Sequence, residues 1–357
     1  MRVALFSMGS ETSKRILAAL AKEFDDVHHI DIRKVEMRIG KGKPVVLVEG
    51  KELTTHYDCV YLKSSFRYAQ MQHALADFFE AKAYIPIKPW AYNVVNDKML
   101  THLALEKAGI PTPETYLTPT VGAAKALLKE INFPIILKIP GGTHGKGVMF
   151  AESEASAAGI LDTLEGLKQA VVMQEYIETD GQDIRALVVG DKVVAAMMRK
   201  ASGGEKRANI HAGGSAEAVI LDAHTKKVAI NTARALGADI CAVDILESVK
   251  GPLVLEANLS PGLQGIMETT SRNIPGDFAA FLKQKTIAFK NAKIGVETAT
   301  DIVEEANGNG AQKIISKLDF RGERILLSKI ISKFSKFTED HEAVITVKSG
   351  KIEIERV

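Results

Sequence analysis

Two apolar segments in the second half of the chain constrain the fold more than any other feature. Residues 241–246 and 252–258 both have strand length, and the short polar stretch between them ends in Gly251-Pro252. This pattern predicts an antiparallel strand pair. Side chains two positions apart leave the same face of a strand, so Glu256 and Asn258 share a face. Asp244 can stand opposite them on the partner strand.

The polar side chains of this predicted hairpin indicate a ligand. Two carboxylates and an amide oxygen in an otherwise apolar pair of strands are costly unless a positive group lies between them. Oxygen ligands of this kind suit Mg²⁺, which usually binds together with substrate phosphates. Asp244, Glu256 and Asn258 are therefore predicted to form a magnesium–nucleotide site. The alternative is a solvated sheet face that carries acidic residues by chance.

The composition fits a globular protein of two or three domains. The chain has 357 residues, of which 46% are hydrophobic and 25% charged. Its net charge of +2 argues against a nucleic-acid partner. The two cysteines, Cys59 and Cys241, lie in apolar runs and are expected to be reduced core thiols. No signal peptide or membrane-length apolar run is visible, so we expect a cytoplasmic protein with no membrane partner.

The pattern along the chain divides it into four regions. Residues 1–95 alternate strands and helices and predict an open parallel α/β sheet, which binds ligands where its strands end. Arg67 follows such a strand end and can hold a substrate carboxylate, although a plain surface arginine fits equally. Residues 96–178 and 179–292 predict two α+β regions. From residue 293 to 357 the charged fraction rises, which indicates a small α+β appendage ending in a hairpin.

A glycine-rich loop lies in the second region. Pro140-Gly-Gly-Thr-His-Gly-Lys-Gly147 can bring backbone N–H groups close to phosphate. It is not a P-loop, because Gly147 follows Lys146 where Ser or Thr is needed. A strand resumes at Val148, which predicts a flap over a nucleotide, and an ordinary hairpin is the alternative. Lys138 ends the apolar strand before the loop, either as a functional ammonium or as a lysine extending from a sheet edge.

Two further segments carry candidate binding groups. The strand over residues 170–177 ends in Glu175 and Tyr176, which can offer a carboxylate and backbone groups to adenine and ribose. Residues 183–199 predict a hairpin around Gly190-Asp191. Asp183 and Arg185 share a face of its first strand, and Arg199 stands at the far end of the second.

Taken together, the chain resembles the ATP-grasp superfamily, and specifically the RimK-type α-L-glutamate ligases, over about residues 1–290. The motifs that carry the resemblance occur in one order: Asn96-Asp-Lys98, Gly109-Ile-Pro-Thr-Pro113, Pro134-Ile-Ile-Leu-Lys138, Gly141-Gly-Thr-His-Gly-Lys-Gly-Val148, Gln174-Glu-Tyr-Ile177, Asp183-Ile-Arg185, Arg207-Ala-Asn209, Val243-Asp-Ile-Leu246, Gly251-Pro-Leu-Val-Leu-Glu-Ala-Asn258 and Ser260-Pro-Gly262. The resemblance implies an ATP-grasp fold with an N-terminal α/β domain, a central lid and a C-terminal nucleotide and metal domain.

The resemblance also implies roles for individual residues. Lys98 and Lys138 would contact ATP phosphates under the loop. Asp244, Glu256 and Asn258 would ligate two Mg²⁺ ions, with Mn²⁺ as a substitute. The other implied nucleotide contacts are Gly145, Lys146, Gly147, Gln174, Glu175, Tyr176, Ile177 and Asp183. Arg207 and Asn209 would act with Lys138 on the reacting groups.

The implied reaction is an ATP-dependent carboxylate–amine ligation through an acyl phosphate, which needs no side-chain nucleophile. L-Glutamate is the expected amino acid, because Arg185, Arg199 and Arg207 supply cations for two carboxylates. The acceptor is a protein C-terminus, a carrier protein or a cofactor ending in glutamate. The chain departs from its relatives at Ala212 and over residues 62–70, two regions expected to face the acceptor.

Two other functions remain alternatives at this point: another ATP-grasp reaction, such as a kinase or a carboxylase, and a non-catalytic ATP-binding regulator. The complete set of lysines and acidic ligands argues against the regulator. We expect a homo-oligomer, in which residues 293–357 serve acceptor recognition or assembly. Replacing Asp244 or Glu256 by its amide is expected to remove turnover and to leave the fold intact.

Overall fold

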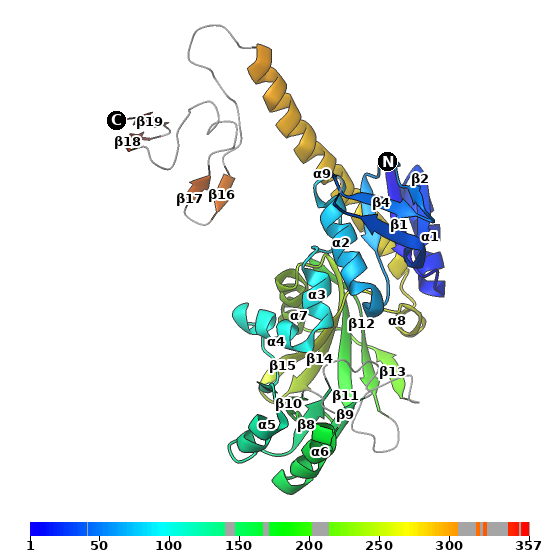
Figure 1. Cartoon of the computed structure of the whole chain (residues 1–357), viewed down its shortest axis with the longest axis vertical. Helices are drawn as coiled ribbons and strands as arrows, with labels where there is room; N and C mark the ends of the chain where they lie inside the picture. Colours follow the sequence, from blue (N-terminus) through cyan, green and yellow to red (C-terminus); the bar gives the residue numbers. More distant parts are fainter. Residues whose placement is uncertain are drawn as a thin grey trace. The chain divides into compact units, whose positions relative to one another are not determined.

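The computed structural model describes residues 1–40, 42–139, 147–166, 171–201, 214–305, 319–321, 324–326, 342–349 and 351–356 (Figure 1). The chain forms two compact units, Met1–Ile287 and Ala288–Val357. The division falls inside the long helix α9 (Ile274–Glu305), close to the predicted boundary at residue 293. The predicted divisions after residues 95 and 178 lie within the first unit and stay predictions. None of the described helices combines the length and the apolar character needed to cross a bilayer.

The N-terminal part of the first unit is built on a parallel sheet in the order β2 (Asp26–Asp31), β1 (Arg2–Ser7) and β6 (Cys59–Leu62). Helices α1 (Glu11–Glu23) and α2 (Ala69–Glu80) follow β1 and β6 in the chain. Ser10 caps α1 by accepting a hydrogen bond from the Ser13 N–H. A small antiparallel sheet lies beside them, with strands β3 (Val35–Arg38), β4 (Val45–Val48) and β5 (Lys51–Glu52). The parallel α/β sheet is as the sequence predicted.

A four-stranded antiparallel sheet forms the next layer, in the order β7 (Thr115–Thr118), β10 (Val171–Glu175), β8 (Ile135–Lys138) and β9 (Val148–Ala151). Helices α3 (Ala91–Asn96) and α4 (Lys98–Lys107) precede it, and α5 (Val121–Leu127) and α6 (Glu154–Gly166) lie between its strands in sequence. Its apolar side chains form a core cluster of their own. Lys138 ends an interior strand of this sheet, so the sheet-edge alternative for this lysine is wrong.

The third layer is a five-stranded antiparallel sheet, in the order β13 (Ser215–Ala218), β12 (Lys192–Lys200), β11 (Gln182–Val189), β14 (Ile240–Ser248) and β15 (Gly251–Asn258). Helix α7 (Ala223–Ala235) connects β13 to β14, and α8 (Gln264–Thr270) follows β15. The apolar residues of this sheet and of the N-terminal sheet belong to one continuous core. The shared core fixes the five-stranded sheet against the N-terminal sheet.

The second unit contains two described hairpins. One pairs β16 (Asp319–Arg321) with β17 (Arg324–Leu326), and the other pairs β18 (Ala343–Lys348) with β19 (Lys351–Arg356). The final hairpin lies where the sequence predicted strands. Several of its apolar side chains are exposed, including Val347 at 70% and Ile345 at 60%.

Candidate functional site

The predicted acidic hairpin exists, and its register is the one that gathers the acidic side chains. Strands β14 and β15 are antiparallel, with Asp244 opposite Glu256 and Ala242 opposite Asn258. Directly opposed residues point to the same side of a sheet, so all three polar side chains share one face. Asp244 is buried, whereas Glu256 and Asn258 are exposed.

A β-bulge sets this register. Ile245 pairs with Val254, but the neighbouring Asp244 pairs with Glu256, so Leu255 is an extra residue on β15. Without the extra residue, Asp244 would oppose Leu255, and both Glu256 and Asn258 would point to the other side of the sheet. The bulge therefore places the two exposed polar side chains of β15 beside Asp244.

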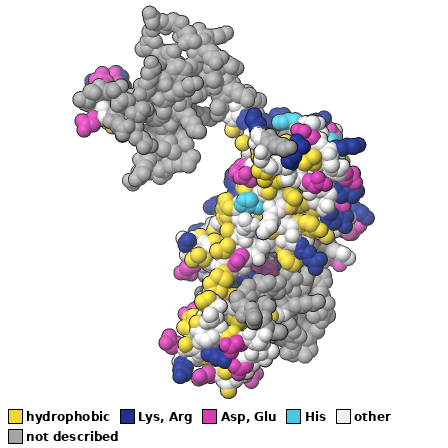
Figure 2. Space-filling view, viewed as in Figure 1, with side chains coloured by type: hydrophobic (Ala, Val, Ile, Leu, Met, Phe, Trp, Pro, Cys, Tyr) yellow, Lys and Arg dark blue, Asp and Glu magenta, His cyan; other side chains and the backbone are white. Residues whose placement is uncertain are grey.

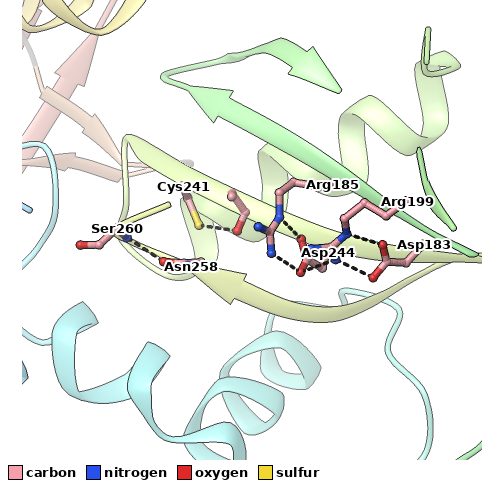
Figure 3. Close-up of polar contacts among 8 residues, drawn as sticks. Asp183, Arg185, Arg199, Cys241, Asp244, Asn258 and Ser260 are labelled. Atoms are coloured by element: carbon pink, nitrogen blue, oxygen red, sulfur yellow. Dashed lines mark hydrogen bonds and ion pairs between the residues drawn. The ribbon is translucent and has the colours of Figure 1, made fainter. Parts of the chain in front are cut away.

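Two arginines on the neighbouring strands hold the Asp244 carboxylate (Figure 3). Arg185 on β11 donates from Nε and Nη2 to the two oxygens of Asp244, at 2.7 and 2.6 Å. Arg199 on β12 donates from Nη2 to Asp244 at 2.8 Å and binds Asp183 with two hydrogen bonds of 2.5 and 2.6 Å. The side chains of Asp244 and Asp183 are only 3% and 7% exposed, so this is a buried network of two acids and two bases.

The electrostatics of the face differ from residue to residue. Burial acts to raise the pKa of Asp244, but the Arg185 and Arg199 guanidinium groups outweigh burial and hold that pKa below its usual value. Although the Glu256 residue is exposed at the face of the sheet, the protein around its carboxyl group disfavours the charged form and raises the pKa, and the Asp244 carboxylate raises it further. Asp244 is thus ionised, and the Arg185 and Arg199 guanidinium groups balance its negative charge. The Arg185 and Lys138 cations oppose this shift of the Glu256 pKa only in part.

Two lysines reach the same region from other elements. Burial lowers the pKa of Lys138 to about 8; the Lys98 ammonium lowers it too, and the Glu256 carboxylate opposes the shift. These couplings bring together Lys98 at the start of α4, Lys138 at the end of β8 and Glu256 on β15. Both lysines thus lie close enough to influence one another electrostatically, and their binding of phosphate stays a prediction.

Gln174 fixes the orientation of Lys138. Its side-chain carbonyl accepts a hydrogen bond from the Lys138 ammonium, and its amide donates to the Thr115 hydroxyl at 2.8 Å and to His102 at 3.2 Å. Burial lowers the pKa of His102 to about 4, and Lys138 and Lys98 contribute, so this imidazole is neutral at pH 7. His102 and Thr115 could not be singled out from the sequence, because neither belongs to a motif with recognisable spacing.

The predicted adenine-binding segment and flap are partly described. Glu175 ends β10, accepts a hydrogen bond from the Glu114 N–H at 3.4 Å and lies 3.7 Å from the Lys250 ammonium. Tyr176, next to the half-buried Ile177, packs edge-on against Phe150 of β9 with ring centroids 4.9 Å apart. Gly147 has φ +77°, a backbone conformation that favours glycine, and a Cβ there would lie 3.3 Å from Ile139. Four predicted site residues lie outside the described residues: Gly145, Lys146, Arg207 and Asn209.

The arginines predicted to bind substrate carboxylates lie in two different environments. Arg67 is exposed on the short 3₁₀ turn Phe66–Tyr68 beyond β6. Arg185 and Arg199 instead donate Nε and Nη2 to protein carboxylates, so these donors already have partners. We therefore interpret Arg185 and Arg199 first as supports of Asp244 and Asp183.

The donor set on the acidic face fits a hard divalent cation. The four lone-pair positions of Asp244 accept three hydrogen bonds, and the Asn258 amide oxygen accepts one, from the Ser260 N–H at 2.8 Å. Lone pairs thus remain on both groups beside the Glu256 carboxylate. Among the described residues no cluster of three or more His, Cys, Asp or Glu side chains forms a metal site by itself. Mg²⁺ held here would complete its coordination with phosphate oxygens and water.

Comparison with known proteins places this geometry in a family. A family model described as the RimK-like ATP-grasp domain matches residues 95–282. A probable alpha-L-glutamate ligase of Thioalkalivibrio sulfidiphilus is 33% identical over 289 residues, which is 80% of this chain and 96% of the relative. One from Vibrio cholerae is 34% identical over 298 residues, covering 82% and 98%. The ATP-grasp ligase PsnB, solved with minimal precursor, Mg and ADP, superposes with a TM-score of 0.62 at 19% identity, over 80% of this chain and 98% of PsnB.

These findings confirm the predicted fold and family. The likeness to PsnB supports the fold, and the family model with the curated relatives supports the membership. The chain belongs to the RimK-like ATP-grasp family and is an ATP-dependent carboxylate–amine ligase.

Proposed function

We propose that the enzyme attaches L-glutamate through its amino group to a carboxylate acceptor. The acceptor carboxylate attacks the γ-phosphoryl group of ATP and releases ADP, and the amine then displaces phosphate from the acyl phosphate to form the amide. The support for glutamate is the name alpha-L-glutamate ligase carried by relatives that match most of this chain. The observation that carries the chemistry is the acidic face of β14 and β15, with Glu256 coupled to Lys138.

Different residues would bind the ATP phosphates and the metal. Lys98 and Lys138 would bind the ATP phosphates, and Gln174 would hold the Lys138 ammonium in place. Asp244, Glu256 and Asn258 would hold one or two Mg²⁺ ions, with Mn²⁺ as a substitute. When bound, Mg²⁺ supplies positive charge next to the phosphate oxygens. Positioning and charge neutralisation would then supply most of the catalysis, as in other phosphoryl transfers.

Arg185 and Arg199 would preserve the metal-binding face during the reaction. Arg185 and Arg199 fix the Asp244 carboxylate from two strands, so a ligand oxygen keeps its place whether or not a cation is bound. Asp183 would act indirectly, by holding Arg199. Arg207 and Asn209 stay predicted contacts of the reacting groups.

A peptide-like acceptor is the class that we favour. PsnB was solved with a precursor peptide, and the curated relatives are named as ligases of an amino acid. The chemical candidates are a protein C-terminus, a carrier protein and a cofactor ending in glutamate, and the exposed Arg67 would contact the acceptor. A cytoplasmic location and a homo-oligomeric assembly stay predictions from the sequence.

A screen of amino acids and acceptors tests the proposal. Phosphate release from Mg-ATP should require both an amino acid and a carboxylate acceptor, and L-glutamate should outcompete neutral amino acids. The acceptor should gain the mass of a glutamyl residue. Glu256→Gln should remove this activity, while Glu217→Gln, a matched change at an exposed residue on β13 of the same sheet, should retain it. Phosphate release that needs bicarbonate, or transfer of phosphate to a product without an amine, would show a carboxylase or a kinase instead.

A further inference from the structure

Lys63 is a buried cation for which the site described above has no use. It follows β6 directly, its amide donates to the Phe6 carbonyl at 2.9 Å, and only 7% of the residue is exposed. Within the part of the chain that the structure describes, its ammonium has no hydrogen-bond or ion-pair partner. Burial alone lowers its pKa to about 8. Its Nζ is not among the buried side-chain atoms that lack a partner, so the ammonium reaches solvent from a buried stem and is open to an anion.

The position of Lys63 is one where sheets of this kind bind ligands. Strands β1 and β6 are parallel, with Phe6 opposite Leu62, so the segments that follow them leave the same edge of the sheet. Open parallel sheets bind ligands at the carboxyl ends of their strands. Lys63 is the first residue beyond that end on β6.

The loop after β15 joins this edge at two points. The Ser64 N–H donates to the Ser260 hydroxyl at 3.1 Å, and the Leu263 N–H donates to the Thr12 hydroxyl at 3.4 Å. The Ser260 N–H in turn donates to the Asn258 side-chain oxygen at 2.8 Å. Figure 3 shows this last contact at the end of β15. Lys63 is therefore one residue away from a chain of two hydrogen bonds that leads to the metal-binding face.

We propose that Lys63 binds a carboxylate group of a ligation substrate and holds that substrate beside the metal-binding face. An anion is the complementary ligand, because no acidic side chain among the described residues pairs with this ammonium. The ATP phosphates already have Lys98 and Lys138, whereas the acceptor and the amino acid both carry carboxylates. The inference rests on the proposed ligase function, and it adds a carboxylate subsite at the carboxyl edge of the N-terminal sheet.

The variant Lys63→Met tests the subsite by direct binding. It removes the charge and keeps an unbranched apolar side chain. Thermal unfolding is followed with increasing L-glutamate, and separately with a short peptide ending in glutamate, each in the presence of a non-hydrolysable ATP analogue and Mg²⁺. Lys63→Arg tests rescue by charge, and Lys22→Met, an exposed lysine on α1, is the matched control.

The subsite predicts a combination of effects that a structural lysine would not give. Lys63→Met should leave the melting temperature of the ligand-free protein unchanged or higher. It should weaken binding of one of the two probes by about tenfold or more, the size expected for loss of a charged hydrogen bond. The affinity for the ATP analogue should not change. The probe whose affinity falls identifies the source of the carboxylate. Weaker binding of L-glutamate would assign the subsite to the amino acid, and weaker binding of the peptide would assign it to the acceptor.

The opposite results would overturn the subsite. A lower melting temperature for Lys63→Met would show that Lys63 has a structural partner. If Lys63→Met binds both probes as tightly as the wild type does, and the wild type ligates glutamate, the subsite alone is refuted. Absence of amino-acid-dependent phosphate release by the wild type, with Lys63-dependent binding intact, would refute the proposed function alone.

Discussion

Replacing Asp244 by Asn should lower the free energy of unfolding and also inactivate the enzyme. Asp244 is 3% exposed and accepts three hydrogen bonds from two guanidinium groups, at 2.6–2.8 Å. Asparagine keeps the shape but removes the charge, which leaves Arg185 and Arg199 with one buried carboxylate, Asp183. Breaking a buried ion pair in this way costs about 3–5 kcal/mol of the free energy of unfolding.

The cost should depend on pH in a defined direction. The arginines lower the folded-state pKa of Asp244 below that of the unfolded chain. The stabilisation is therefore fully present above the unfolded pKa of about 4, and it is lost as the pH falls toward the folded value. The difference between wild type and Asp244→Asn should be largest near neutral pH and should shrink in acid.

Urea unfolding followed by far-ultraviolet circular dichroism measures this difference. Glu256→Gln is the matched control from the same face, and it should be as stable as the wild type or more so. The fold raises the pKa of Glu256, so at neutral pH the ionised carboxylate weakens the folded state, and the amide removes that penalty. Both variants should lack turnover. An unfolding free energy for Asp244→Asn within about 1 kcal/mol of wild type would refute the buried network.

Three further outcomes follow from the same structure. Affinity for Mg-ATP should fall as the pH rises through about 8, where Lys138 loses its proton. Lys138→Met should weaken binding by about tenfold or more and abolish that pH dependence. A pH-independent wild-type affinity would contradict this role. Gly147→Ala should weaken ATP binding because of its φ of +77° and the nearby Ile139, whereas Gly122→Ala, in open space on α5, should not. Removing residues 296–357 should leave Mg-ATP affinity unchanged and alter acceptor KM or solution mass, and a folded truncation unable to bind ATP would show that the tail completes the nucleotide site.

The acidic hairpin could be predicted because the sequence pattern that specifies it lies within one short stretch of the chain. A period of two in the apolar pattern gives the strands, and the same period places Glu256 and Asn258 on one face. The bulge at Leu255 could not be predicted, since one extra residue leaves no mark in that pattern, yet it decides which face β15 presents to Asp244. The prediction that Glu256 and Asn258 share a face was still correct, because both residues follow the bulge in the chain.

The buried ion network could not be predicted because it depends on strand order. The sequence placed Asp183 and Arg185 on one face, but only the order β12, β11, β14 brings Arg199 and Arg185 to Asp244. For that reason Asp244→Asn is expected to keep the fold but to make it less stable, a cost that the sequence did not reveal. Lys63 illustrates the same limit: a lysine after a strand looks ordinary until its 7% exposure is known.

The central claim, ligation through an acyl phosphate, can be tested most directly by following one oxygen atom. An acceptor whose carboxylate carries a heavy oxygen isotope is incubated with the enzyme, Mg-ATP and L-glutamate, and the released phosphate is analysed by mass spectrometry. The mechanism predicts that one labelled oxygen per amide bond passes from the carboxylate to the released phosphate, and that Glu256→Gln abolishes the transfer. Phosphate released without the label, while the amide still forms, would contradict the acyl-phosphate mechanism.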